Sequence, residues 1–128
     1  MLSIAVENTG NVAVLRCTGR IVRGEALSKL RNVVTSRTNV RIVVLDLTNV
    51  EVLDAGGLSA LVTLNEWTCR QGIQLKIVGA SPFILKIFAI TQLDRVLDIS
   101  TLDQVLQLLR YPIMSEGACS ARAHIAAY

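Results

Sequence analysis

The most unusual chemical groups in this 128-residue chain occur where Asp54 and two glycines precede a helical pattern. An aspartate in that place can accept hydrogen bonds from the first N–H groups of a helix. In a structural interpretation, Asp54 only caps the helix and the glycines make the bend. In a functional interpretation, the bare backbone of Gly56 and Gly57 at the positive end of the helix binds an anion or the carboxylate of a partner protein.

Residues suited to catalysis are scarce elsewhere. The only histidine, His124, lies close to the C-terminus, where a side chain is usually solvated. The sequence contains no G-x-S-x-G elbow, no G-x-x-x-x-G-K-[ST] phosphate loop, no G-x-G-x-x-G fingerprint and no H-E-x-x-H zinc helix. The cysteines Cys17, Cys69 and Cys119 include no C-x-x-C pair. We therefore expect no enzymatic activity, no cofactor and no metal site.

The composition argues against several other classes of protein. Hydrophobic residues make up 52% of the chain and charged residues 18%, which is too apolar for a disordered protein. No apolar run approaches the ~18 residues of a membrane span. The net charge is only +3 and 4% of residues are aromatic, so nucleic-acid binding is not expected. The first residues, MLSIAVEN, show no signal-peptide pattern, and we expect a cytoplasmic protein.

Alternating strand-like and helix-like periodicities predict an α/β or α+β layer structure built on one core. Two β-compatible segments, 2–7 and 11–18, flank Asn8–Gly10 and are expected to form an antiparallel hairpin. A helical pattern follows over 25–36. The almost continuously apolar run 40–47 is typical of a central strand that is covered on both faces.

The second half of the sequence continues this alternation. It has a helical pattern over 57–70 and a strand pattern over 73–78, and Ser81–Pro82 is a strong helix start. A short stretch over 96–99 follows. Ser100–Asp103 then resembles a capping box with aspartate in the carboxylate position, which opens a last helix.

These elements and the Asp54 turn together resemble a known family. The stretches VVLDLTNVEVLDAGGLSALV and GIQLKIVGASPFILKIF, with a closing LDRVLDI, are similar to the STAS domain family, named for sulfate transporters and anti-sigma factor antagonists. The resemblance covers about residues 2–110 and includes a D-x-x-G-L element at 54–58. It implies a STAS-like fold over 1–110, with a mixed sheet of four or five strands and helices mainly on one face, followed by a C-terminal extension, 111–128.

In the anti-sigma factor antagonists of this family, the domain binds a protein kinase that otherwise holds a sigma factor. Phosphorylation of a serine or threonine in the turn ends that binding. Asp54 matches the family aspartate, Gly57 matches the family glycine, and Ala55–Gly56 occupy the Ser-[Ser/Thr] positions. The resemblance therefore implies a turn without a phosphoacceptor. The nearest hydroxyls, Thr48 and Ser59, lie outside the motif, and Ser59 is the candidate substitute.

The resemblance also implies a contact surface for the protein partner. This surface is formed by Asp54, Ala55, Gly56, Gly57, Leu58 and Arg23. The loop after the hairpin, which lies near the turn in this family, carries Arg20 and Arg23 where relatives often have an acidic residue. With Gly56 and Gly57, these arginines predict an anion-binding site.

We therefore expect a non-enzymatic regulator that binds an anti-sigma factor of the serine kinase type and is not switched by phosphorylation. Two alternatives remain open. One is a STAS-type accessory subunit of a membrane transporter ATPase, a role for which a missing acceptor is natural. The other is a sensor of small anions or nucleotides. The sequence also leaves open whether the chain forms a homodimer.

Overall fold

The computed structural model describes residues 2–37, 39–101 and 103–104. Its centre is a five-stranded sheet in the order β1-β2-β3-β4-β5. The strands are β1 (Leu2–Thr9), β2 (Val12–Ile21), β3 (Ile42–Leu53), β4 (Gln74–Val78) and β5 (Asp98–Ile99). β1 is antiparallel to β2, and every other neighbouring pair is parallel. The predicted mixed sheet and its N-terminal hairpin are both confirmed.

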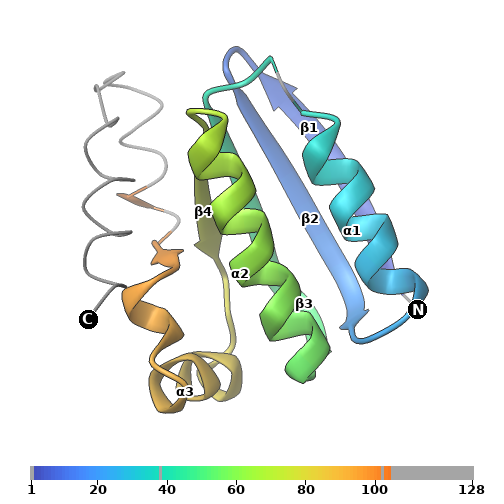
Figure 1. Ribbon diagram of the computed structural model, residues 1–128, viewed down its shortest axis with the longest axis vertical. Helices are drawn as coiled ribbons and strands as arrows, with labels where there is room; N and C mark the ends of the chain where they lie inside the picture. The colour runs from blue at the N-terminus through green and yellow to red at the C-terminus, as the bar shows by residue number, and fades with distance from the viewer. Residues whose placement is uncertain (1, 38, 102, 105–128) are drawn as a thin grey trace.

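Three α-helices and one short 3-10 helix connect the strands of the described chain. They are α1 (Glu25–Thr35), α2 (Ala55–Arg70), α3 (Pro82–Ile90) and η1 (Leu93–Arg95). α1 and α2 lie side by side on one face of the sheet, as Figure 1 shows. In the order β2-β3-β4, each parallel strand lies on the same side of the strand before it. Right-handed crossovers from β2 to β3 and from β3 to β4 therefore place α1 and α2 on the same face of the sheet. The prediction of helices mainly on one face is confirmed.

The main core lies between the sheet and these two helices. Leu15 and Leu45 on the strands and Leu30 and Leu61 on the helices are completely buried in one cluster. The opposite face of the sheet has a smaller cluster around Val44, which is 1% exposed. Both faces of β3 are therefore covered in its first half, which explains why the sequence there is apolar without alternation.

Several element boundaries differ from the sequence prediction, and α2 begins at Ala55 where 57 was expected. The hairpin turn consists of Gly10 and Asn11, because Thr9 still pairs with Val12. Gly10 supplies the left-handed backbone conformation there, with φ 59°. β3 also continues further than predicted, to Leu53, because β2 is long enough to pair with it as far as the start of α2.

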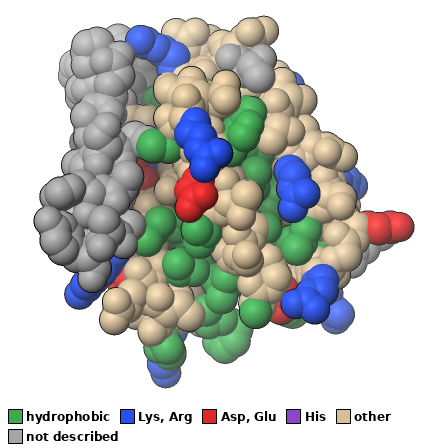
Figure 2. Space-filling view, viewed as in Figure 1, with side chains coloured by type: hydrophobic (Ala, Val, Ile, Leu, Met, Phe, Trp, Pro, Cys, Tyr) green, Lys and Arg blue, Asp and Glu red, His purple; other side chains and the backbone are tan. Residues whose placement is uncertain are grey.

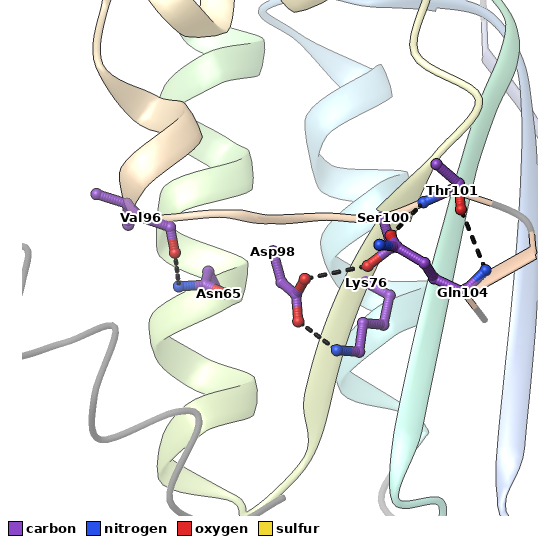
Figure 3. A network of polar contacts seen from close by, with 7 residues as sticks. All are labelled: Asn65, Lys76, Val96, Asp98, Ser100, Thr101 and Gln104. Atoms are coloured by element: carbon purple, nitrogen blue, oxygen red, sulfur yellow. Dashed lines mark hydrogen bonds and ion pairs between the residues drawn. The ribbon is translucent and has the colours of Figure 1, made fainter. Parts of the chain in front are cut away.

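A polar network attaches the last described strand to the sheet (Figure 3). Lys76 of β4 and Asp98 of β5 form an ion pair in which both side chains are largely buried, and the Ser100 hydroxyl lies 3.1 Å from the same carboxylate. The capping box begins one residue later than predicted. The Thr101 hydroxyl accepts the N–H of Gln104 at 3.1 Å, and the Gln104 side chain accepts the N–H of Thr101 at 2.9 Å, which is the reciprocal pattern of such a box.

Some sequence predictions lie outside the described residues. These are the helix after residue 104 and the extension 111–128 with Cys119 and His124, so the boundary near residue 110 stays a prediction. Within the described part of the chain, no helix combines the length and the apolarity that a membrane crossing needs. In the same residues, no three His, Cys, Asp or Glu side chains lie close enough together to hold a metal ion.

Candidate functional site

The Asp54 turn lies at the carboxyl end of β3, where the chain passes directly into α2. β2 runs parallel to β3 and ends at the same edge of the sheet, with Ile21 paired to Leu53. The loop between β2 and α1, which contains Arg23, therefore begins next to the turn. Sheet topology alone brings together two segments that are 31 residues apart in the sequence.

Asp54 connects these two segments through its carboxylate. Its Oδ1 accepts a hydrogen bond from the N–H of Gly57 at 2.8 Å, as the N-cap of α2, and its Oδ2 accepts one from the N–H of Arg23 at 3.2 Å. These two backbone N–H groups, helped by the positive charge of Arg23, hold the pKa of the Asp54 carboxyl below its ordinary value. The capping interpretation of Asp54 is confirmed, and the same carboxylate also fixes the Arg23 loop against α2.

Gly57 is buried within the first turn of α2 and does not form a bend, so the structural interpretation of this glycine was wrong in that respect. A Cβ on Gly57 would lie 2.2 Å from the carbonyl oxygen of Ile21 and 2.7 Å from Leu53 Cδ1. Carbon atoms do not approach a backbone oxygen so closely without displacing it. Glycine is required here because the end of β2 passes directly over the start of α2.

Gly56 also belongs to α2, but it has more space and is partly exposed. A Cβ on Gly56 would lie 3.3 Å from Arg23 Cβ, 3.3 Å from Asp54 Oδ1 and 3.4 Å from Leu27 Cδ1. All three are side-chain atoms, which can move by a few tenths of an ångström. The fold can therefore accommodate a small side chain at position 56, and packing does not demand glycine there.

The other predicted contact residues surround these glycines. Ala55 and Arg23 are exposed, and Leu58 is half-buried. Ser59 is exposed on α2. Thr48 is exposed on β3, where its hydroxyl donates to the carboxylate of Asp46 and is already engaged.

Arg20 does not join Arg23 at the turn. Arg20 is exposed and pairs with the exposed Val52, whereas the next pair, Ile21 and Leu53, is buried in the main core. Because side chains alternate along a strand, Arg20 projects from the face of the sheet opposite α1 and α2.

The predicted anion site gains no support from this geometry. Only Arg23 of the two arginines adjoins the turn. The Asp54 carboxylate already accepts the N–H groups of Gly57 and Arg23, and its negative charge would repel an incoming anion. Anion binding therefore stays an untested prediction.

Two neighbours of the turn could not be recognised from the sequence as belonging to the site. Ile21 contributes its backbone oxygen, and because every residue has one, the residue type gives no indication of this contact. Leu27 has the ordinary spacing of an apolar residue on the core side of a helix. Both approach the glycines only because β2 and α1 are folded against α2. A sequence pattern would have found Leu27 only as a member of the core.

Comparisons with known proteins agree with this architecture. The STAS domain family model matches residues 3–107. The crystal structure of an anti-sigma factor antagonist from Mycobacterium paratuberculosis is similar, with a TM-score of 0.72 and 26% identity over 86% of this chain and 95% of that chain. The anti-sigma factor antagonist SpoIIAA in its unphosphorylated form matches with a TM-score of 0.66 and 14% identity over 85% of this chain and 99% of that chain.

The structure of the Bacillus cell fate determinant SpoIIAA in the phosphorylated form is also similar. It has a TM-score of 0.65 and 14% identity over 84% of this chain and 99% of that chain. No curated protein matches the sequence. Since the family model spans most of the chain and the sheet and helices agree with its solved relatives, the chain belongs to the STAS domain family.

Proposed function

We propose that this chain is a cytoplasmic anti-sigma factor antagonist that binds its partner through the Asp54 turn and is not switched by phosphorylation there. The observation that carries the proposal is the pair Ala55–Gly56 at the exposed start of α2, in the positions where the family motif has hydroxyl residues. Neither residue has an oxygen that could be phosphorylated. Family membership and the 26% identity to the antagonist from Mycobacterium paratuberculosis support the binding role.

The geometry of the turn suits a preformed contact surface. Asp54 holds the Arg23 loop and the start of α2 in fixed relation through two hydrogen bonds. Ala55 and Arg23 are exposed beside Gly56. A surface that is already ordered loses little conformational entropy when a partner binds.

The absence of a hydroxyl has a direct electrostatic consequence. A phosphate would add roughly −1.5 to −2 charges at the turn and would repel an acidic or closely packed partner surface. Gly56 has no hydroxyl that could accept a phosphoryl group, whichever kinase is present. The chain is therefore expected to stay in its binding-competent form after its partner's kinase has acted on other antagonists.

The contact surface can be tested with two substitutions of equal size at position 56. The purified anti-sigma factors encoded in the same genome are titrated with the parent chain, Gly56→Asp and Gly56→Asn by calorimetry. We expect Gly56→Asp to bind at least about tenfold more weakly than Gly56→Asn, because only the aspartate adds a fixed charge. Equal affinity of the parent and Gly56→Asp for a cognate anti-sigma factor would show that the turn is not the interface.

The unswitched state can be tested by intact-mass measurement after incubation with ATP and the same anti-sigma factor kinases. The parent chain should gain no mass, whereas Gly56→Ser, which restores a hydroxyl where there is room for one, should gain about 80 Da. Gly56→Ala is the matched control without an oxygen. A gain in the parent that maps to Ser59 or Thr48 would contradict the proposal. Co-purification with a transporter ATPase would instead favour the accessory-subunit alternative.

A further inference from the structure

Strand β1 is an edge of the sheet, with β2 on one side and no strand of the described chain on the other (Figure 1). Its eight residues pair with β2 from Leu2 to Thr9 without a register shift, so the open side is long and regular. An edge strand presents a row of unpaired backbone N–H and C=O groups, which native proteins protect with lysine, proline, a bulge or a short strand. β1 has none of these features, and its sequence LSIAVENT contains one charged residue, Glu7.

The even-numbered residues of β1 direct their backbone groups to the open edge. Thr9 and Val12 flank a two-residue turn, and in such a hairpin the flanking pair exchanges both of its hydrogen bonds. Because these pairs alternate along an antiparallel ladder, the odd-numbered residues bond to β2 and the even-numbered ones point away from it. The carbonyl oxygen of Leu2 agrees with this assignment, since it accepts a hydrogen bond from Lys29 Nζ of α1 at 2.9 Å.

Half-buried apolar side chains line this open edge on the helix side of the sheet. Ile4 and Val6 pack against the main core but stay partly exposed, and so does Val33 of α1. Lys29, four residues before Val33, reaches the Leu2 carbonyl, so this side of α1 flanks the edge of β1. A strand added here would pair with the backbone of β1 and cover this apolar surface at the same time.

The sequence of β1 is complementary to itself in one antiparallel register. Residues directly opposite each other on antiparallel strands lie on the same face of the sheet, so even-numbered residues must meet even-numbered ones. If Ala5 lies opposite Ala5 of a second copy, Ile4 of each copy lies opposite Val6 of the other. These two apolar pairs are then the hydrogen-bonded pairs, because both residues direct their backbone groups to the edge. The register pairs residues 2–8 of each copy.

Charge does not oppose this pairing. Ser3 of each copy lies opposite Glu7 of the other, so the two glutamates lie toward opposite ends of the paired strands. Glu7 already forms an ion pair with Arg16 of β2 in its own chain, at 3.3 Å. On the face formed by α1 and α2, the Lys and Arg side chains of the described chain are scattered and do not form one patch (Figure 2). With a net charge of only +3, two copies that meet beside α1 repel each other weakly.

We propose that the β1 edge binds a second copy of this chain, and that the two copies pair antiparallel through β1 to form one continuous sheet. This inference goes beyond the proposed function and does not depend on it. A two-fold axis perpendicular to the sheet relates the copies and brings their α1 helices together on one face. Since paired strands alone cover little surface, the two α1 helices supply further buried area.

The dimer leaves the Asp54 turn of each copy accessible. The turn lies at the carboxyl end of β2, and β1 runs antiparallel to β2. Because the two-fold axis reverses the direction of β1, the two turns lie at opposite ends of the dimer. Two partner proteins can therefore be bound without contact between them.

Sedimentation velocity of the full chain over about a hundredfold range of concentration tests the dimer. The parent should change from monomer to dimer, with no larger species. Ala5→Lys puts two like charges opposite each other, where the Cα atoms of a non-hydrogen-bonded pair are about 4.5 Å apart. We expect its dimer dissociation constant to rise by at least about tenfold. Its circular dichroism should match that of the parent, because Ala5 is exposed.

Thr18→Lys is the matched control. Thr18 is exposed and pairs with Ser3, so it lies on the same face of the sheet as Ala5 but one strand away from the edge. Its dimer should be unchanged. Ala5→Glu alone should weaken the dimer as Ala5→Lys does, and an equimolar mixture of the two variants should restore it. Opposite charges meet in this mixture only if residue 5 of one copy lies opposite residue 5 of the other.

Several results would overturn the inference. These are a parent that stays monomeric, growth beyond two copies, an Ala5→Lys dimer as stable as that of the parent, or a mixture that does not restore the dimer. Weaker binding of an anti-sigma factor by Ala5→Lys, with a monomeric parent, would assign the edge to an extended segment of that partner and would also overturn it. Gly56→Asp keeps the two proposals separate. If it weakens binding of the anti-sigma factor and the parent is monomeric, only the dimer inference fails.

Discussion

Replacing Gly57 by alanine removes the space that lets β2 end directly over α2. The new Cβ would lie 2.2 Å from the Ile21 carbonyl oxygen, so the backbone of β2 or the start of α2 must move by about 1 Å to restore an ordinary contact. Forced overpacking of this kind costs about 1–3 kcal/mol. Alanine recovers up to about 1 kcal/mol of helix propensity over glycine. Because the clash is with backbone, we expect the upper part of the range, a net loss of about 2 kcal/mol.

Gly56→Ala is the matched control, one residue earlier in the same helix turn. It brings the same gain in helix propensity, but its Cβ would lie no closer than 3.3 Å to any neighbour, and these neighbours are side-chain atoms. We expect its stability to stay within about 0.5 kcal/mol of the parent, or to rise slightly.

The free energy of unfolding of both variants is measured by urea denaturation. Circular dichroism and the fluorescence of Trp67, which packs against the core, monitor the transition. A loss of about 2 kcal/mol corresponds to a fall of about 8 °C in Tm for a domain of this size. Equal stability of Gly57→Ala and Gly56→Ala would refute the close approach of the Ile21 carbonyl to α2. The arrangement of the turn derived from that contact would then be wrong.

Three further predictions concern charged and buried groups. The lowered pKa of Asp54 means that its carboxylate stabilises the fold above the ordinary value of about 4 and loses this effect as the pH falls further, so the Tm advantage of the parent over Asp54→Asn should shrink in acid. Burial, and to a lesser extent the charge of Asp46, raise the pKa of Cys17 to about 12, so mass mapping at pH 8 should detect its alkylation by iodoacetamide only after unfolding. Lys76→Met removes the cation beside the largely buried Asp98 and should cost about 1–3 kcal/mol, with faster hydrogen exchange at Ser100 as the local sign.

Local patterns were sufficient to predict most of the helices and strands. The apolar run in β3 indicated a strand because both of its faces are buried, and Ser81 with Pro82 marked the start of α3 because a cap needs only a hydroxyl and a free backbone N–H nearby in the sequence. The cap formed by Asp54 was predictable for the same reason. These interactions join residues within one helical turn, so the sequence contains all the information that they require.

The partners of the turn were decided by the tertiary structure. Arg23 reaches Asp54, and Ile21 reaches Gly57, only because β2 and β3 are parallel and end together. Arg20 is turned to the opposite face, and its pairing with β3 follows two register shifts in β2.

A register shift of one residue exchanges the two faces of a strand. Gly19, with φ 116°, stands at the second shift and is a local sign of an irregularity in β2, but its presence in the sequence does not give the register of β2 against β3. The chemistry of the turn was therefore visible in the order of the amino acids. The packing of distant segments decided which arginine adjoins the turn and why Gly57 must be glycine. These contacts depend on strand register and not on local spacing.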